Sequence, residues 1–339
     1  MAVTDPVLNM AIDAAIPLRR GFVAEKVYLP SRPEGISINS DTGVASFTYY
    51  TVDEKNVLGV NGRSLQATPG QPFIGISSRL ADATGTAKLY GVSHRLPREE
   101  GDGFEDRGVS DIESQMIVPA LTAAWLINLE TLFTTKFAAL STYGLANTTA
   151  SDRWSDASSD LLGQIVTGVN SIQVESGLGY DAVNVVMTKA YWDEVIGHPQ
   201  VLGKLPSDAM ASIGAQMFAR IVSAEAFGFD DDDTDAVPPV RVHISTARYD
   251  SAADGASESK ARIWANGCLI YVAPPTDASG MADVRANGFG KNFQAAERFT
   301  ERYETPEKRL NVTETSQIMG MENVNETASY FITGAIAAG

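Results

Sequence analysis

The residues that could carry acid–base or metal chemistry are few and lie far apart in the sequence. The chain contains three histidines, His94, His198 and His243. None belongs to a hydrolase, zinc-protease or phosphate-loop motif, because G-x-S-x-G, H-E-x-x-H and G-x-x-x-x-G-K-[ST] are all missing from the sequence. His198 precedes a proline in a predicted turn. We therefore interpret each histidine as structural, and we predict no catalytic, cofactor-binding or metal-binding site and no enzyme activity.

The densest charge cluster runs from Asp230 to Asp233 and continues at Asp235. Carboxylate oxygens are ligands for hard cations, so one interpretation is a cation site. The cluster does not fit the calcium-binding loop, because Ala236 stands at the glycine position and Val242 at the position of the terminal glutamate. We favour a solvated loop and leave the cation site open.

Two other features favour structural interpretations. The segment from Gly177 to Ala182 matches the dinucleotide fingerprint G-x-G-x-x-A, which requires a strand before it and a helix after it. Here a helix is predicted before it and a strand after it, so we interpret the match as chance. Cys268 is the only cysteine and lies in an apolar run, which indicates a small buried side chain and excludes an intrachain disulfide. We expect packing roles for Trp154, Trp192 and Trp264.

Composition restricts the class of protein. The chain has 339 residues, of which 44% are hydrophobic, so it can bury a substantial core. Its formal net charge of -16 argues against a surface that binds nucleic acid tightly. We find no signal-peptide pattern and no run that approaches the roughly 18 apolar residues of a membrane span. These observations predict a soluble protein made in a cytoplasm.

The first hundred residues predict an arm and a long hairpin. Residues 1–40 contain several prolines and no long periodic pattern, so an extended arm fits better than a packed unit. Two strands are predicted, at 43–56 and 86–94, from their β-branched and aromatic side chains. The segment 57–85 between them is rich in Gly, Ser, Thr and Pro and predicts an irregular loop, which is typical of a functional segment.

A long helix is the clearest element. Ser110 and Glu113 form a capping box, and apolar residues then recur at helical spacing to Leu140. The helix is predicted over about 110–142, with Leu129 and Phe133 buried and a kink near Pro119. The remaining elements indicate an α+β fold. Helices are expected from residue 158 or 159 onward, at 190–196 and at 208–219, and strands at 183–187, 220–224, 240–245, 262–273, within 293–318 and at 328–336.

The order of these elements resembles the Hong Kong 97 capsid fold of tailed bacteriophages. Local motifs strengthen the resemblance: Asp152-Arg-Trp-Ser-Asp-Ala-Ser-Ser-Asp160, although Leu161 stands where proline is usual; the stretch from Val183 to Pro199; and the strand from Ile263 to Pro274. The resemblance implies an N-terminal arm over 1–42, an E-loop hairpin over 43–94, a peripheral domain with the spine helix over 95–155, an axial domain over 156–290, and a return to the peripheral domain over 291–339.

The function that this resemblance implies is that of a major capsid protein. Pentamers and hexamers of the chain would build an icosahedral shell in the host cytoplasm and enclose double-stranded DNA, contacting it weakly and without sequence preference. A separate scaffold protein is expected because only 109 residues precede Ser110. A portal and a cement protein are further expected partners, and no membrane is involved. An encapsulin-type nanocompartment shell is the alternative, and an enzyme of unknown class is a third.

Covalent cross-linking of the shell is a property of the family's founding member. It joins an E-loop lysine to an asparagine of a neighbour, beside a buried carboxylate. In this chain the candidate lysines are Lys55 and Lys88, neither of which lies in the loop tip between 57 and 85. The candidate acceptors are Asn311, Asn323 and Asn325, and no motif singles one out. We therefore predict a shell without covalent links.

Overall fold

The computed structural model describes most of the chain, with gaps. The described residues are 3–16, 21–38, 44–52, 80–97, 99, 113–139, 145–147, 152–176, 183–205, 213–229, 238–252, 257, 259–264, 267–277, 280–282, 288–305 and 309–336. Five sequence features lie wholly or partly outside them: Ser110 of the capping box, the predicted loop 57–85, the segment 177–182, the acidic cluster at 230–235, and Lys55.

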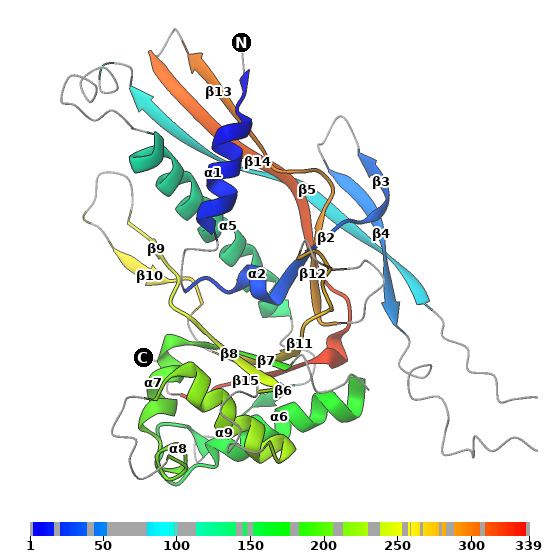
Figure 1. Cartoon of the computed structure of the whole chain (residues 1–339), viewed down its shortest axis with the longest axis vertical. Coiled ribbons are helices and arrows are strands. Elements are labelled where there is room, and N and C mark those ends of the chain that lie inside the picture. Colours follow the sequence, from blue (N-terminus) through cyan, green and yellow to red (C-terminus); the bar gives the residue numbers. More distant parts are fainter. Residues whose placement is uncertain are drawn as a thin grey trace, which may run out of the picture.

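An eight-stranded sheet forms the upper half of the described chain in Figure 1. Its main path runs β1 (Val3–Thr4), β13 (Phe299–Thr305), β14 (Leu310–Asn323), β5 (Leu80–Pro97), β4 (Ala45–Val52) and β3 (Glu34–Ile38). Strand β12 (Gly290–Gln294) pairs antiparallel with β14 and parallel with β2 (Tyr28–Ser31). Segments from both ends of the sequence therefore share one sheet.

The predicted hairpin is present, and its second strand is longer than the sequence indicated. Strands β4 and β5 are antiparallel, and the last described pair at their open end is Val52 with Leu80. Strand β5 begins at Leu80, within the segment predicted to be irregular, and its second half pairs with β14. One strand thus belongs to both the hairpin and the body. Figure 1 shows β3 and β4 projecting to one side of the molecule.

The long helix packs against strands β5 and β14 of this sheet. It starts as a π-helical turn, η2 (Glu113–Ile117), and continues as α5 (Val118–Ala139). Pro119 is the second residue of α5, and its missing N–H cannot donate to the preceding turn, which accounts for the irregular start. Leu129 and Phe133 are buried, as predicted.

The same helix corrects one expectation from composition. The segment Gln115–Lys136 is long and apolar enough to cross a membrane by length and composition, so the prediction that no such segment exists was wrong. In the fold half of it is buried, and it packs against the N-terminal helix α1 (Pro6–Ala15) and strands β5 and β14. A helix in the core of a globular domain requires the same apolar character.

A second sheet forms the lower half of Figure 1. Its order is β6 (Leu145–Asn147), β15 (Ser329–Thr333), β11 (Cys268–Val272), β7 (Val183–Thr188) and β8 (Val240–Ser245). Strands β7 and β11 are buried at every position, as expected for continuous apolar runs. Helix α6 (Leu161–Ser176) packs on β11 and β15, and Gly168 leaves room for Ile270 and Tyr330. The helices α7 (Lys189–Gly197), α8 (Pro199–Leu202) and α9 (Ala215–Phe227) complete this half.

The N-terminal segment is more structured than an extended arm. Helix α1 (Pro6–Ala15) begins with Pro6 after Asp5, whose side chain accepts a hydrogen bond from the backbone N–H of Leu8. Leu8, Ile12 and Ile16 recur every four residues and are buried in the main core. A short helix, α2 (Ala24–Val27), follows. In the sequence, Pro6 and Pro17 lie at the two ends of this helix and favoured the prediction of an extended arm. The helix is short and amphipathic, and tertiary packing stabilises it.

Three element predictions needed correction in the second half. The helix expected at 208–219 is α9, which begins at Ala215 after Gly214 and ends before Gly228, whose φ of 64° closes it. The strand expected at 220–224 is wrong, because the β-branched pair Ile221–Val222 belongs to this helix. The strand expected at 262–273 is two strands, β10 (Lys260–Arg262), which pairs with β9 (Arg248–Asp250), and β11. The other expected strands are present, and a short turn η6 (Glu326–Ala328) precedes β15.

Candidate functional site

His198 lies beside a serine and makes the hydrogen bonds of a helix cap. Its Nε2 is 3.1 Å from Ser159 Oγ and 3.2 Å from the carbonyl oxygen of Asp156. Its Nδ1 accepts the backbone N–H of Gln200 at 3.3 Å, so this nitrogen is unprotonated and Nε2 carries the proton. A nucleophilic serine requires the opposite arrangement, with Nε2 accepting the serine proton. His198 therefore caps α8 and links it to the segment before α6.

The other two histidines lie in different strands. His94 lies in β5, opposite Thr313 of β14. His243 lies in β8, and its Nε2 is 3.3 Å from Asn184 Oδ1. Burial, with help from the positive charges of Lys26 and Arg241, lowers the pKa of His243 to about 4, so it is neutral at physiological pH. No group of three or more metal-ligating side chains occurs within the described ranges.

The cysteine and the tryptophans have packing roles, as predicted. Cys268 is a free, fully buried thiol, and burial raises its pKa far above the usual range. The Trp154 indole N–H donates to Gln164 at 2.8 Å, and its ring meets Tyr191 edge-on at 5.0 Å. The three side chains Trp154, Trp192 and Trp264 are buried in the core.

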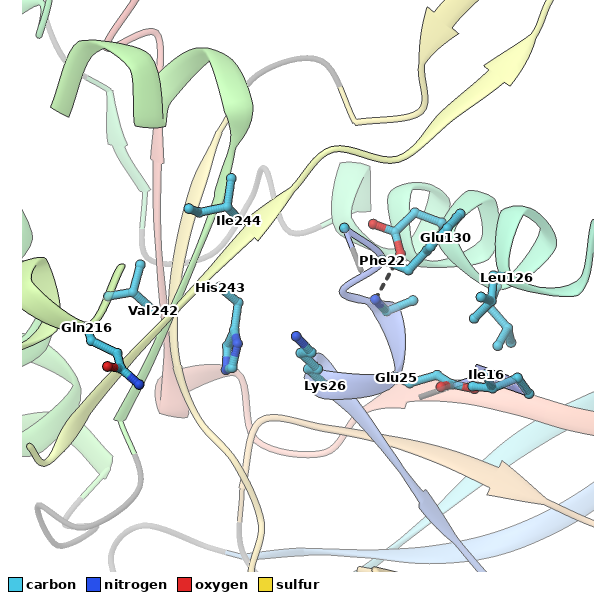
Figure 2. A pocket seen from close by; sticks show the side chains of 13 residues that line it. Ile16, Phe22, Glu25, Lys26, Leu126, Glu130, Gln216, Val242, His243 and Ile244 are labelled. Atoms are coloured by element: carbon cyan, nitrogen blue, oxygen red, sulfur yellow. Dashed lines mark hydrogen bonds between the residues drawn. The ribbon is translucent and has the colours of Figure 1, made fainter. Parts of the chain in front are cut away.

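A cavity of about 610 Å³ lies between the N-terminal segment, α5, α9 and β8. Figure 2 shows its polar side chains: Glu25 and Lys26 from α2, Glu130 from α5, Gln216 from α9 and His243 from β8. The remaining lining residues are mostly apolar: Ile16, Gly21, Phe22, Ala24, Leu126, Leu129, Val242 and Ile244. The cavity offers two carboxylates, an ammonium group and a neutral imidazole, and the described residues of its lining include no serine, threonine or cysteine.

Glu130 joins three separate parts of the chain within this cavity. One of its carboxylate oxygens accepts the backbone N–H groups of Val23 at 3.0 Å and Ala24 at 2.9 Å. The other accepts the hydroxyl of Ser245 at 3.2 Å. The Glu130 side chain is fully buried, and burial raises its pKa, while these hydrogen bonds and the charge of Lys26 lower it. The carboxylate thus fastens the start of α2 and the end of β8 to the long helix.

Glu25 is the second carboxylate of the cavity, and no described residue provides it with a comparable set of donors. It is an exposed residue. Burial, followed by the negative charge of Glu130, raises the pKa of Glu25 to about 7. Sequence analysis singled out neither glutamate. A signal for Glu130 existed, because it shares the buried face of the helix with Leu126, Leu129 and Phe133 at helical spacing.

Helix α1 is held by a second set of polar contacts. Arg298 pairs with Asp13, and Arg302 pairs with Asp5 at 3.0 Å. The Arg298 guanidinium also lies over the Trp125 ring of α5, at 5.6 Å from the ring centroid. Burial lowers the pKa of Arg298 to about 10, so the group stays charged at neutral pH. The N-terminal segment is therefore attached to the long helix and to β13 at two places.

Comparison with known proteins identifies the architecture. No protein-family model and no curated protein matches the sequence. A phage-related protein from Bordetella bronchiseptica RB50 is similar in structure over 99% of this chain and 98% of that chain, with a TM-score of 0.63 and 14% identity. A virus-like particle from Pyrococcus furiosus is similar over 96% and 97%, with a TM-score of 0.52 and 13% identity. The projecting hairpin, the long helix and the two sheets thus form the fold that the sequence resemblance implied, and the chain has the Hong Kong 97 capsid fold.

Proposed function

We propose that this chain is the major capsid protein of a tailed bacteriophage, a structural subunit that assembles into an icosahedral shell around double-stranded DNA. The observation that carries the proposal is the similarity to a virus-like particle over nearly the whole of both chains. The similarity includes no unmatched domain large enough for a separate activity. The role is structural and needs no catalytic residue.

The projecting hairpin supports the proposal. Strands β3 and β4 project to one side of the body, and Phe47 of β4 packs against Phe293 of β12 (Figure 1). Contact with a neighbouring subunit would bury these strands further, and permanent interfaces bury thousands of Å². The net charge of -16 suits a wall that encloses DNA without binding it tightly.

The proposed organisation follows the family. The arm covers 1–42, the E-loop 43–94, the peripheral domain 95–155 with its return at 291–339, and the axial domain 156–290. The proposed partners are copies of the same chain in pentamers and hexamers, a separate scaffold protein, a portal and a cement protein. The mature protein would reside in the virion after assembly in the host cytoplasm.

Electron microscopy of the purified protein tests this function. We expect closed shells, and we expect shells recovered from infected cells to contain nuclease-protected DNA. Shells filled with folded enzymes would instead support an encapsulin-type compartment. A protein that stays monomeric at high concentration, with and without a co-expressed scaffold, would contradict both kinds of shell.

We predict that the shell contains no covalent links between subunits. Lys88 is exposed on β5, but two of the candidate acceptors are occupied. Asn323 Oδ1 accepts the Tyr28 hydroxyl at 2.6 Å, and Asn325 Oδ1 accepts the backbone N–H and the hydroxyl of Thr327. Boiling mature particles in detergent with reductant should release one band near 36.2 kDa. A ladder of multimers would show that a cross-link forms after all.

A further inference from the structure

The hairpin formed by β9 and β10 carries two arginines directly opposite each other, Arg248 and Arg262, which we call the arginine pair. The hairpin is a two-stranded sheet separate from both larger sheets. Both side chains are exposed, and neither forms an ion pair or a hydrogen bond among the residues that the structure describes. Like charges at directly opposite positions destabilise a sheet, and an isolated two-stranded sheet has little stability of its own. Acidic groups from outside the hairpin would therefore stabilise it.

The other charges of the hairpin do not compensate the arginine pair. Asp250 and Lys260 are the next residues on the same face, and they lie opposite each other. The Asp250 side chain also accepts the backbone N–H groups of Ala252 at 3.0 Å and Ser259 at 2.8 Å, so it is occupied at the end of the hairpin. The face thus carries three positive charges and one negative charge, in a chain whose net charge is -16.

A second like-charged pair lies on the upper sheet. Glu301 of β13 is directly opposite Glu314 of β14, and we call these residues the glutamate pair. Successive side chains of a strand alternate between the two faces of a sheet. The neighbouring Thr300 is buried and its hydroxyl lies 3.3 Å from Asn9 of α1. The glutamate pair therefore lies on the face of the sheet away from α1, and both residues are partly accessible.

Aromatic side chains flank the glutamate pair on this face. Phe299 and Tyr303 lie two residues before and after Glu301, Phe299 is 39% exposed, and the Tyr303 hydroxyl donates to Glu314 at 2.7 Å. Arg95 of β5 lies on the same face, and among the described contacts it forms no ion pair with either glutamate. Guanidinium groups pair with carboxylates and stack on aromatic rings. The face therefore offers both kinds of group that bind an arginine.

We propose that the arginine pair of one copy of the chain binds the glutamate pair of a second copy, so that the β9–β10 hairpin docks on the β13–β14 face. Both pairs are opposite residues of antiparallel strands, whose Cα atoms are about 4.5–5.5 Å apart, so their spacings match. The hairpin lies at the left of Figure 1 and β13 at its upper end, so the two pairs meet between copies and not within one.

The contact joins two different surfaces, and a contact of this kind closes a ring when it is repeated by rotation. Pentamers and hexamers are rings of this kind. The inference rests on the proposed function in one respect, which is that copies of this chain associate with each other. It adds which surfaces meet and which charges select them.

Charge reversal in the full-length protein provides the test. One variant combines Arg248→Glu with Arg262→Glu, and a second combines Glu301→Arg with Glu314→Arg. Each places like charges against each other, so we expect the fraction of protein that sediments as shells to fall by about tenfold or more. A fourfold variant with all four changes restores opposite charges across the contact. Its shell fraction should return to within about threefold of the wild type, because the two sites are coupled.

The control variant combines Arg32→Glu with Lys204→Glu. Both side chains are exposed, so these changes alter the net charge by the same amount away from the proposed contact and should leave assembly unchanged. Thermal unfolding of the subunits checks that each variant is folded. If loss of the Tyr303 hydrogen bond unfolds the Glu314 variant, Glu301→Arg alone replaces it, and Arg248→Glu should rescue its assembly.

Normal shells from either double reversal would overturn the proposed contact. A fourfold variant that assembles no better than the double reversals would also overturn it, because complementary charge would then not be the cause. Both results leave the capsid function intact as long as the wild type forms shells in the same experiment. Wild-type protein that never associates would overturn the contact and the proposed function together.

Discussion

Replacing Leu129 with aspartate is expected to eliminate soluble protein. Leu129 is 2% exposed on the buried face of α5, and it lines the cavity that already holds Glu25 and Glu130. Among the described residues of the surrounding wall, Lys26 is the only cation with which a third carboxylate could pair. An uncompensated buried charge costs about 3–5 kcal/mol, which is a large part of the roughly 5–15 kcal/mol that stabilises a typical domain.

The matched control for this variant is Ala124→Asp. Ala124 is exposed on the same helix, so its replacement adds the same charge without burying it. The control should remain soluble, with a melting temperature within a few degrees of the wild type. The measurement is the soluble fraction after expression, followed by thermal unfolding of whatever is soluble. A soluble Leu129→Asp protein with an unchanged melting temperature would contradict the assignment of α5 to the core.

Shortening the E-loop should abolish shell assembly without unfolding the subunit. Val52 and Leu80 lie opposite each other at the end of the β4–β5 hairpin. Residues 53–79 can therefore be replaced by a two-residue Asn-Gly turn, which matches the twist of a two-stranded hairpin and preserves its register. Loop tips of this kind tolerate excision, so far-UV circular dichroism and thermal unfolding should be close to those of the wild type. Electron microscopy should show subunits or small oligomers in place of closed shells.

A second variant separates the sequence of the removed segment from its length. In this variant a glycine–serine linker of equal length replaces residues 53–79. If the side chains of the segment contact a neighbouring subunit, both variants lose assembly. If only the span matters, the linker variant retains it. Normal shells from the Asn-Gly variant would show that the projecting arm has no part in assembly, and the proposed role of the hairpin would be wrong.

Local patterns in the sequence were sufficient for most of the architecture. The apolar residues at helical spacing predicted the long helix and the burial of Leu129 and Phe133. The apolar runs at 183–187 and 268–272 predicted the two central strands of the lower sheet. These predictions were correct because each element buries one continuous face, and burial of that face imposes its period on the sequence.

The predictions that failed concern elements for which local preference and tertiary packing disagree. Helix α1 is short and would be unstable alone, and it forms because Leu8 and Ile12 pack into the main core. The pair Ile221–Val222 has strand preference but lies in α9, where Ile221 and Val222 are both buried. In both cases burial outweighs the conformational preference of the isolated segment. The residues of the segment itself do not indicate the surface on which it packs.

The sequence by itself determined the order of the elements, the positions of the long helix and the central strands, and through them the fold. Only the tertiary structure revealed the cavity and the roles of its two glutamates. Glu130 and the backbone N–H of Val23 are 107 residues apart along the chain, and β2 pairs with β12 across an even longer separation. Helical or strand periodicity describes which face of one element is buried, and it contains no information about the distant group that the face meets. The pKa of Glu25 depends on the desolvation and the charge that such distant groups supply. Its shift can therefore be inferred only from the folded chain.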